Sequence, residues 1–74
     1  MNLFKYNEIW NESWRYFRHY SEKIPLSDED WKEMIDMSSI FVDRHMDHER
    51  FARKLIVIIV REIEMRDSEA RGNR

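Results

Sequence analysis

The sequence has no cysteine, a single glycine and a single proline among its 74 residues. Without cysteine, disulfide bonds and thiolate metal sites are excluded. Because the single glycine lies near the C-terminus, the chain has no glycine-rich loop of the kind that holds phosphate groups. The scarcity of glycine and proline, beside abundant Glu, Lys, Arg and Met, also argues against an all-β fold.

Long hydrophobic runs are missing as well. The longest is Leu55–Val60, six residues flanked closely by Arg53, Lys54 and Arg61, whereas a transmembrane helix needs about 20 apolar residues. The N-terminus has no apolar segment followed by a small-residue cleavage site, so we expect no signal peptide. We therefore expect a cytoplasmic chain of one domain, near the lower size limit for a self-supporting core.

Charge is unevenly distributed although the net charge is only −2. Residues 27–49 carry a net charge of −6, residues 50–74 carry +3 and the first 26 residues carry +1. This asymmetry suits either self-association in an opposite-charge register or a selective protein partner. The basic excess is too small for a typical nucleic-acid-binding protein.

The apolar run Leu55–Val60 is rich in β-branched residues, so its own periodicity cannot distinguish a strand from a helix. Its context favours a helix. Asp47 is a candidate N-cap, and Met46 and Phe51 occupy the two positions of a hydrophobic staple across that cap. We predict a helix over His48–Arg66, because no glycine or proline interrupts the helix-forming residues that follow the run.

An amphipathic pattern predicts a first helix from about Asn7, or as early as Leu3, to Lys23. Its apolar stripe is almost wholly aromatic and consists of Tyr6, Trp10, Ser13, Phe17 and Tyr20. Trp14 and Tyr16 lie at the two margins of this stripe. The simpler interpretation is that both pack in the core, and the alternative is that they stay exposed and bind a partner.

Pro25 ends the first helix, and Ser27 with Asp30 forms a predicted capping box that starts a second helix over Asp28–His45. Met37 and Ile40 point away from the predicted inner face of this helix. Together with Val57 on the last helix, these outward apolar residues indicate a second partner-binding surface.

These elements predict an all-α fold, a compact three-helix bundle with short connections and a central third helix. The bundle is expected to occupy residues 1–66, and the polar residues 67–74 to form a frayed tail. The apolar arc of the third helix covers about 200°, roughly twice the width that a surface helix needs. This excess predicts a homo-oligomer whose interface contains Ile56, Ile59, Val60 and Ile63.

The opposite face of the third helix carries a line of basic side chains: Arg50, Arg53, Lys54 and Arg61. The simpler interpretation is a solvated face. The alternative is a site for an anionic nucleotide or nucleic acid, particularly if an oligomer doubles the line.

His45 and His48 are the only metal-ligand residues at close spacing, with Asp43 or Glu49 as further candidates. The predicted cap at Asp47 separates the two histidines and breaks the helical spacing, so we expect no metal site and no cofactor. We also expect no enzymatic activity, because no serine sits in a strand-turn-helix elbow and the paired carboxylates are explained by capping and solvation.

The layout resembles small, uncharacterised helical proteins of phages and mobile elements of Gram-positive bacteria. The resemblance rests on Trp10 and Trp14 in the first helix, Asp30-Trp31 at the start of the second, and the closing Arg61–Glu64 of an apolar last helix. It implies a cytoplasmic non-enzyme that acts by binding. Proteins of this kind are often inhibitors of host machinery, including antiviral defence.

The sequence therefore predicts a small accessory or inhibitory protein that binds another protein as an oligomeric helical bundle. The runner-up prediction is the anionic-ligand site on the basic face of the third helix.

Overall fold

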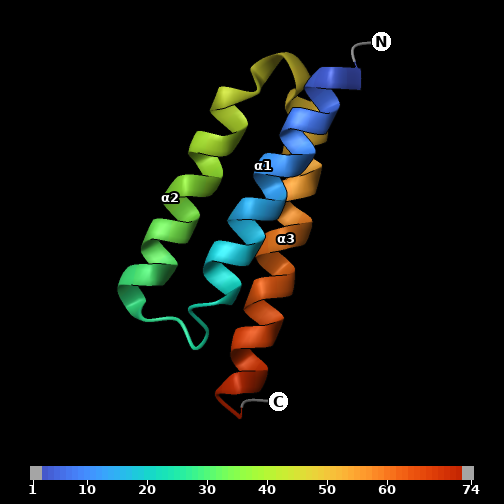
Figure 1. The fold of residues 1–74 in the computed structure, drawn as a ribbon. Coiled ribbons are helices and arrows are strands. Elements are labelled where there is room, and N and C mark those ends of the chain that lie inside the picture. Colours follow the sequence, from blue (N-terminus) through green and yellow to red (C-terminus); the bar gives the residue numbers. More distant parts are fainter. Residues whose placement is uncertain (1–2, 73–74) are drawn as a thin grey trace.

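The structure is a computed structural model that describes residues 3–72. It contains α1 (Leu3–Ser21), α2 (Asp28–Arg44), a short 3-10 turn η1 (Met46–His48) and α3 (Glu49–Ala70), with no strand among the described residues (Figure 1). The predicted all-α three-helix bundle is confirmed.

The chain runs up and down the long axis of an elongated bundle. α1 and α3 lie side by side and point the same way, while α2 runs in the opposite direction (Figure 1). α3 packs against both other helices, as predicted for a central third helix. α1 and α2 are joined by long polar side chains, described below. Among residues 3–72, no helix combines the length and the apolar content that crossing a membrane would require.

The start of α2 follows the predicted capping box. The Ser27 hydroxyl accepts a hydrogen bond from the Asp30 amide at 3.1 Å, and the Asp30 carboxylate accepts one from the Ser27 amide at 3.1 Å. Acidic side chains fill the first turn, where the helix dipole favours negative charge. α2 ends at Arg44, one residue before the predicted end at His45.

The connection between α2 and α3 differs from the prediction at its cap. Asp47 is not the N-cap, because it lies inside the turn η1, and no side-chain hydrogen bond caps the start of α3 at Glu49. The chain instead tightens locally, with the His48 amide donating to the His45 carbonyl at 2.9 Å. This backbone bond takes one of the amides that a side-chain cap would otherwise satisfy.

The prediction of a frayed tail from residue 67 was wrong. α3 continues to Ala70, and the Asp67 carboxylate is buried and accepts hydrogen bonds from the Leu26 amide at 2.7 Å and the Arg71 guanidinium at 2.9 Å. Arg71 also donates to the Leu26 carbonyl. The last turn of α3 is ordered because it satisfies backbone groups of the α1–α2 loop. Positions 73 and 74 of the predicted tail lie outside the described residues.

The core is formed by apolar and aromatic side chains of all three helices and of the α1–α2 loop. Its buried members are Ile9, Tyr16, Tyr20, Leu26, Met34, Phe41, Val42, Ala52, Ile56 and Ile63. Three of these residues were predicted to lie at a binding surface or an oligomer interface, namely Tyr16, Ile56 and Ile63, and those predictions were wrong. A single chain already buries them.

Tyr16 shows why a position at the margin of the apolar stripe does not by itself predict an exposed side chain. Its ring packs between α1 and α2, and its hydroxyl donates to the Met34 carbonyl at 2.7 Å. Burial raises the pKa of the Tyr16 phenol. An aromatic residue at the edge of a stripe is therefore covered here by the neighbouring helix, which supplies the polar partner that its hydroxyl needs.

Candidate functional site

Three exposed apolar side chains of α1 and α3 border one groove between these two helices. Trp10 and Trp14 are each 57% exposed, and Ile58 is 65% exposed. We call this the α1/α3 surface and define it by these three residues and the groove between them. Large exposed side chains that share one face are typical of interaction sites in soluble proteins.

The groove has a volume of about 350 Å³ and lies between α1 and α3. Apart from Ser13 and Glu62 its lining is apolar, and it consists of Trp10, Ser13, Trp14, Phe17, Leu55, Ile58, Ile59 and Glu62. Phe17, Leu55 and Ile59 form a half-buried floor that is anchored on the core.

The two tryptophans are held by neighbouring rings. Trp10 stacks on Phe51 of α3 with 6.4 Å between ring centroids, and Trp14 lies 6.0 Å from Phe17. They recur at helical spacing on α1, so one face carries both. Rigid aromatic side chains lose little conformational entropy on binding, which makes such a pair well suited to anchor a partner.

A second groove, of about 360 Å³, lies between α1 and α2. Its apolar residues belong largely to the core, and it also contains His19 and four charged residues, Glu12, Arg15, Glu33 and Arg44. Several of these charges are already paired within the chain, for example Glu33, which accepts a hydrogen bond from the Tyr20 hydroxyl at 2.7 Å. Burial, followed by the hydrogen bond to Glu33, raises the pKa of the Tyr20 phenol.

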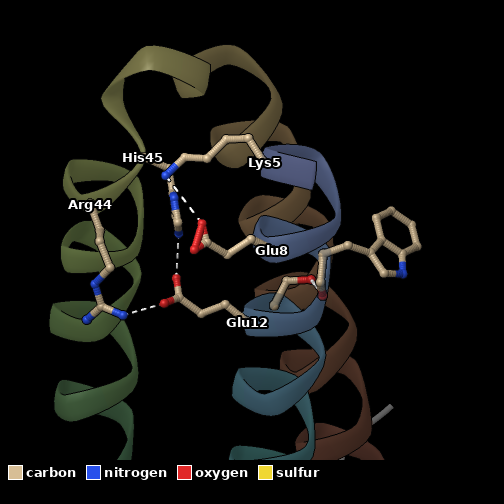
Figure 2. A network of polar contacts seen from close by, with 7 residues as sticks. Lys5, Glu8, Glu12, Arg44 and His45 are labelled. Atoms are coloured by element: carbon tan, nitrogen blue, oxygen red, sulfur yellow. Dashed lines mark hydrogen bonds and ion pairs between the residues drawn. The ribbon is translucent and has the colours of Figure 1, made fainter. Parts of the chain in front are cut away.

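Figure 2 shows the polar network at the upper end of this groove. Glu12 of α1 reaches across to α2, where one carboxylate oxygen contacts His45 Nε2 at 2.7 Å and the other accepts from Arg44. Beside them on α1, Lys5 pairs with Glu8 at 3.4 Å. The His45 ring is buried, and its Nδ1 atom has no partner among the described residues. The network connects the N-terminal half of α1 to the end of α2. The carboxylates of Glu8 and Glu12 are both paired within it.

The four basic residues predicted as an anion site are all exposed: Arg50, Arg53, Lys54 and Arg61. The structure does not gather them around one cavity among the described residues. Arg53 pairs with Glu49 at 2.7 Å and borders a groove that also contains Asp43. Arg61 borders a different groove, beside Glu64. Nearby carboxylates therefore reduce the positive potential that an anion would meet.

The two histidines of the predicted ligand cluster are separated by their partners. His45 faces Glu12, while His48 lies edge-on against Tyr6 with 4.8 Å between ring centroids. Residues 3–72 contain no group of three or more His, Cys, Asp or Glu side chains placed to hold a metal ion.

The remaining predicted binding residues have different positions. Trp14 is exposed on the α1/α3 surface, whereas Met37 is half-buried against the core. Ile40 and Val57 are 44% and 42% exposed, on α2 and on the side of α3 toward α2. Ile59 and Val60, predicted for an oligomer interface, are half-buried against the core of the single chain.

Sequence reasoning missed Trp10 and Ile58. A signal for Trp10 was present, because it lies one helical turn before Trp14. Ile58 was counted within the wide apolar arc of the last helix without being separated from its buried neighbours. The arc is indeed wider than two helices cover, but the uncovered edge is at Ile58 rather than at Ile56 and Ile63.

No protein-family model matches this chain, and no curated protein and no solved structure matches it at a significant level.

Proposed function

We propose that this chain is a small non-catalytic protein that acts by binding another protein through the α1/α3 surface. The observation that carries the proposal is the exposure of Trp10, Trp14 and Ile58 around one apolar groove. Such a surface contributes binding free energy by leaving water, and tryptophan is among the residues that most often dominate protein interfaces.

The biological role that fits this binding activity is accessory or inhibitory. The resemblance to small phage and mobile-element proteins favours an inhibitor that occupies a surface of host machinery, such as an antiviral defence protein, in the cytoplasm. A chain of this size can block a partner simply by covering it, since about 800 Å² on each side is enough for a specific interface.

Site-specific photo-crosslinking tests the binding surface directly. Ile58 is replaced by the photoreactive amino acid p-benzoylphenylalanine, and the chain is produced and irradiated in its natural host cells. We expect a covalent protein adduct, because a partner seated on the groove places its C–H bonds beside position 58. The matched control carries the same replacement at Ile35, which is also exposed but lies on α2.

The adducts are identified by their mass and by peptide sequencing. Adduct formation at position 58 together with its absence at position 35 supports the proposed surface. Equal yields at both positions, or no adduct at position 58, would show that the α1/α3 surface does not bind protein. The same experiment reports whether the adduct contains a second copy of this chain or a different protein.

A further inference from the structure

The outer edge of α3 carries a line of residues that is chemically symmetric about Ile58. Lys54 and Glu62 lie four residues before and after Ile58, and Phe51 and Met65 lie seven residues before and after it. At about 100° per residue, all five stay within roughly 40° of Ile58 around the helix. Lys54, Ile58 and Met65 are exposed, and Phe51 and Glu62 are half-buried.

Reversing this line places each residue opposite a complementary one. The positive Lys54 meets the negative Glu62, which within one chain also accepts a hydrogen bond from Arg66 Nε at 2.9 Å. The aromatic Phe51 meets the thioether of Met65, and Ile58 meets itself. A twofold axis perpendicular to α3 at Ile58 produces this reversal. It makes the contacts between different residues twice and the contact of Ile58 with itself once. Methionine sulfur packs favourably against aromatic rings, and opposite charges across an interface fix its register.

The α1 side of the surface agrees with the same axis. Trp14 lines the same groove as Ile58, and α1 and α3 run parallel (Figure 1). Reversal of α1 about Trp14 brings Trp10 opposite Arg18, four residues away on the other side. Arg18 is exposed, and a guanidinium placed over an indole ring is attracted to it.

A parallel arrangement of two copies lacks this complementarity at Lys54. With the axis along the bundle, α3 of one copy faces α1 of the other. Lys54 then has no Glu62 opposite it, because α3 of the other copy lies elsewhere in the interface. The antiparallel arrangement therefore keeps the pairing of Lys54 with Glu62 that the parallel one loses.

We propose that the α1/α3 surface receives a second copy of this chain, antiparallel about a twofold axis at Ile58 and Trp14, with Lys54 of each copy paired to the partner's Glu62. This inference rests on the proposed function, because it names a second copy of the chain as an occupant of the same surface. A different protein partner then binds that surface only when the chain is a monomer. The product is a dimer in which α1 and α3 of both copies form a four-helix interface.

A charge-reversal series tests the register. Lys54→Glu alone places two carboxylates opposite each other at both ends of the interface, and Glu62→Lys alone places two ammonium groups there. We expect each single variant to raise the dimer dissociation constant about tenfold or more. An equimolar mixture of the two variants pairs each new charge with an opposite one at both ends, so it should associate like the wild type.

Sedimentation velocity measures the association from about 1 μM to about 300 μM protein, a range that covers weak and moderate dimers. Arg53→Glu and Glu64→Lys are matched controls, because they make the same charge changes on the side of α3 that faces α2. Both controls should leave the dissociation constant unchanged within about twofold, the size of effect expected for surface charges outside an interface.

Three results would overturn the inference. The wild type can remain monomeric throughout this range, the dimer can be indifferent to both reversals, or the mixture can fail to restore association. None of them contradicts the proposed function if position 58 still crosslinks to a different protein in host cells. The absence of any adduct at position 58 would instead contradict both the dimer and the proposed function.

Discussion

Asp67 joins the end of α3 to the loop between α1 and α2, and its contacts make the strongest case for a structural role of any single side chain. It is 3% exposed, accepts a hydrogen bond from the Leu26 amide and pairs with Arg71. Burial raises the pKa of the Asp67 carboxyl, but hydrogen bonds from Leu26, Arg71 and Trp31 outweigh burial and hold that pKa below its ordinary value of 3.8. The ionised form is therefore the one that the fold favours.

We predict that Asp67→Asn lowers the free energy of unfolding by about 1–3 kcal/mol at pH 7, because it replaces the ion pair with Arg71 by a hydrogen bond to a neutral acceptor. A carboxyl whose folded pKa is lowered stabilises the protein above its unfolded pKa and loses this contribution as pH falls through the folded pKa. The difference between wild type and variant should therefore be largest at pH 7 and shrink below pH 3.8.

Urea unfolding followed by circular dichroism at pH 7 and at pH 3 measures this difference. Asp36→Asn, which removes an exposed carboxylate on α2, serves as the control and should change the unfolding free energy at pH 7 by less than about 0.5 kcal/mol. A gap between wild type and Asp67→Asn that stays constant with pH would contradict the role of the ionised carboxylate.

The helices themselves could be predicted from sequence because their signals are local. The capping box at Ser27 and the break at Pro25 involve neighbouring residues only. α2 starts at Asp28 as predicted, and α1 ends at Ser21, before the predicted end at Lys23. α3 starts at Glu49, next to the predicted His48, but its cap could not be predicted, because Asp47 has the chemistry of a cap while the 3-10 turn satisfies the backbone without it. The end of α3 was missed for a different reason. Its order depends on Leu26, far away in the sequence.

The difference between local signals and contacts of distant residues also explains how far the candidate site could be predicted. A wheel diagram identifies which α1 and α3 residues are apolar, but which edge stays uncovered depends on where α2 packs. Core packing was the simpler interpretation for both Tyr16 and Trp14, and an exposed, partner-binding position was the alternative. Tyr16 is buried and bonded to Met34, a tertiary contact that has no local signature, whereas Trp14 is 57% exposed.

The start of α2 provides a prediction at the scale of an element. Ser27→Ala removes one hydrogen bond of the capping box and should lower the free energy of unfolding by about 1 kcal/mol, with faster hydrogen exchange at the Asp30 amide. Ser39→Ala is the control, because Ser39 is exposed within α2 and alanine favours a helix interior, so its effect should stay within about 0.5 kcal/mol. Equal losses in the two variants would show that the cap contributes nothing specific.

For the molecule as a whole, the question is which apolar residues support the fold and which serve association. Three helices in a short chain leave a groove of about 350 Å³ beside a closed core. Ile58 and Ile63 lie on the same helix, yet Ile58 is 65% exposed and Ile63 is fully buried. Substitutions at these two isoleucines therefore test binding and folding separately within one helix.

We predict that Ile63→Ser lowers the free energy of unfolding by about 3–5 kcal/mol, because it leaves a cavity and a hydroxyl in the core. Ile58→Ser should lower it by less than about 1 kcal/mol and should abolish association through the α1/α3 surface. Urea unfolding at about 1 μM protein, where mass action disfavours assembly, gives the first quantity, and sedimentation gives the second. If Ile58→Ser unfolded the chain as severely as Ile63→Ser, the exposed edge of α3 would belong to the core rather than to a binding surface. If it kept full association, the partner would lie elsewhere on the bundle.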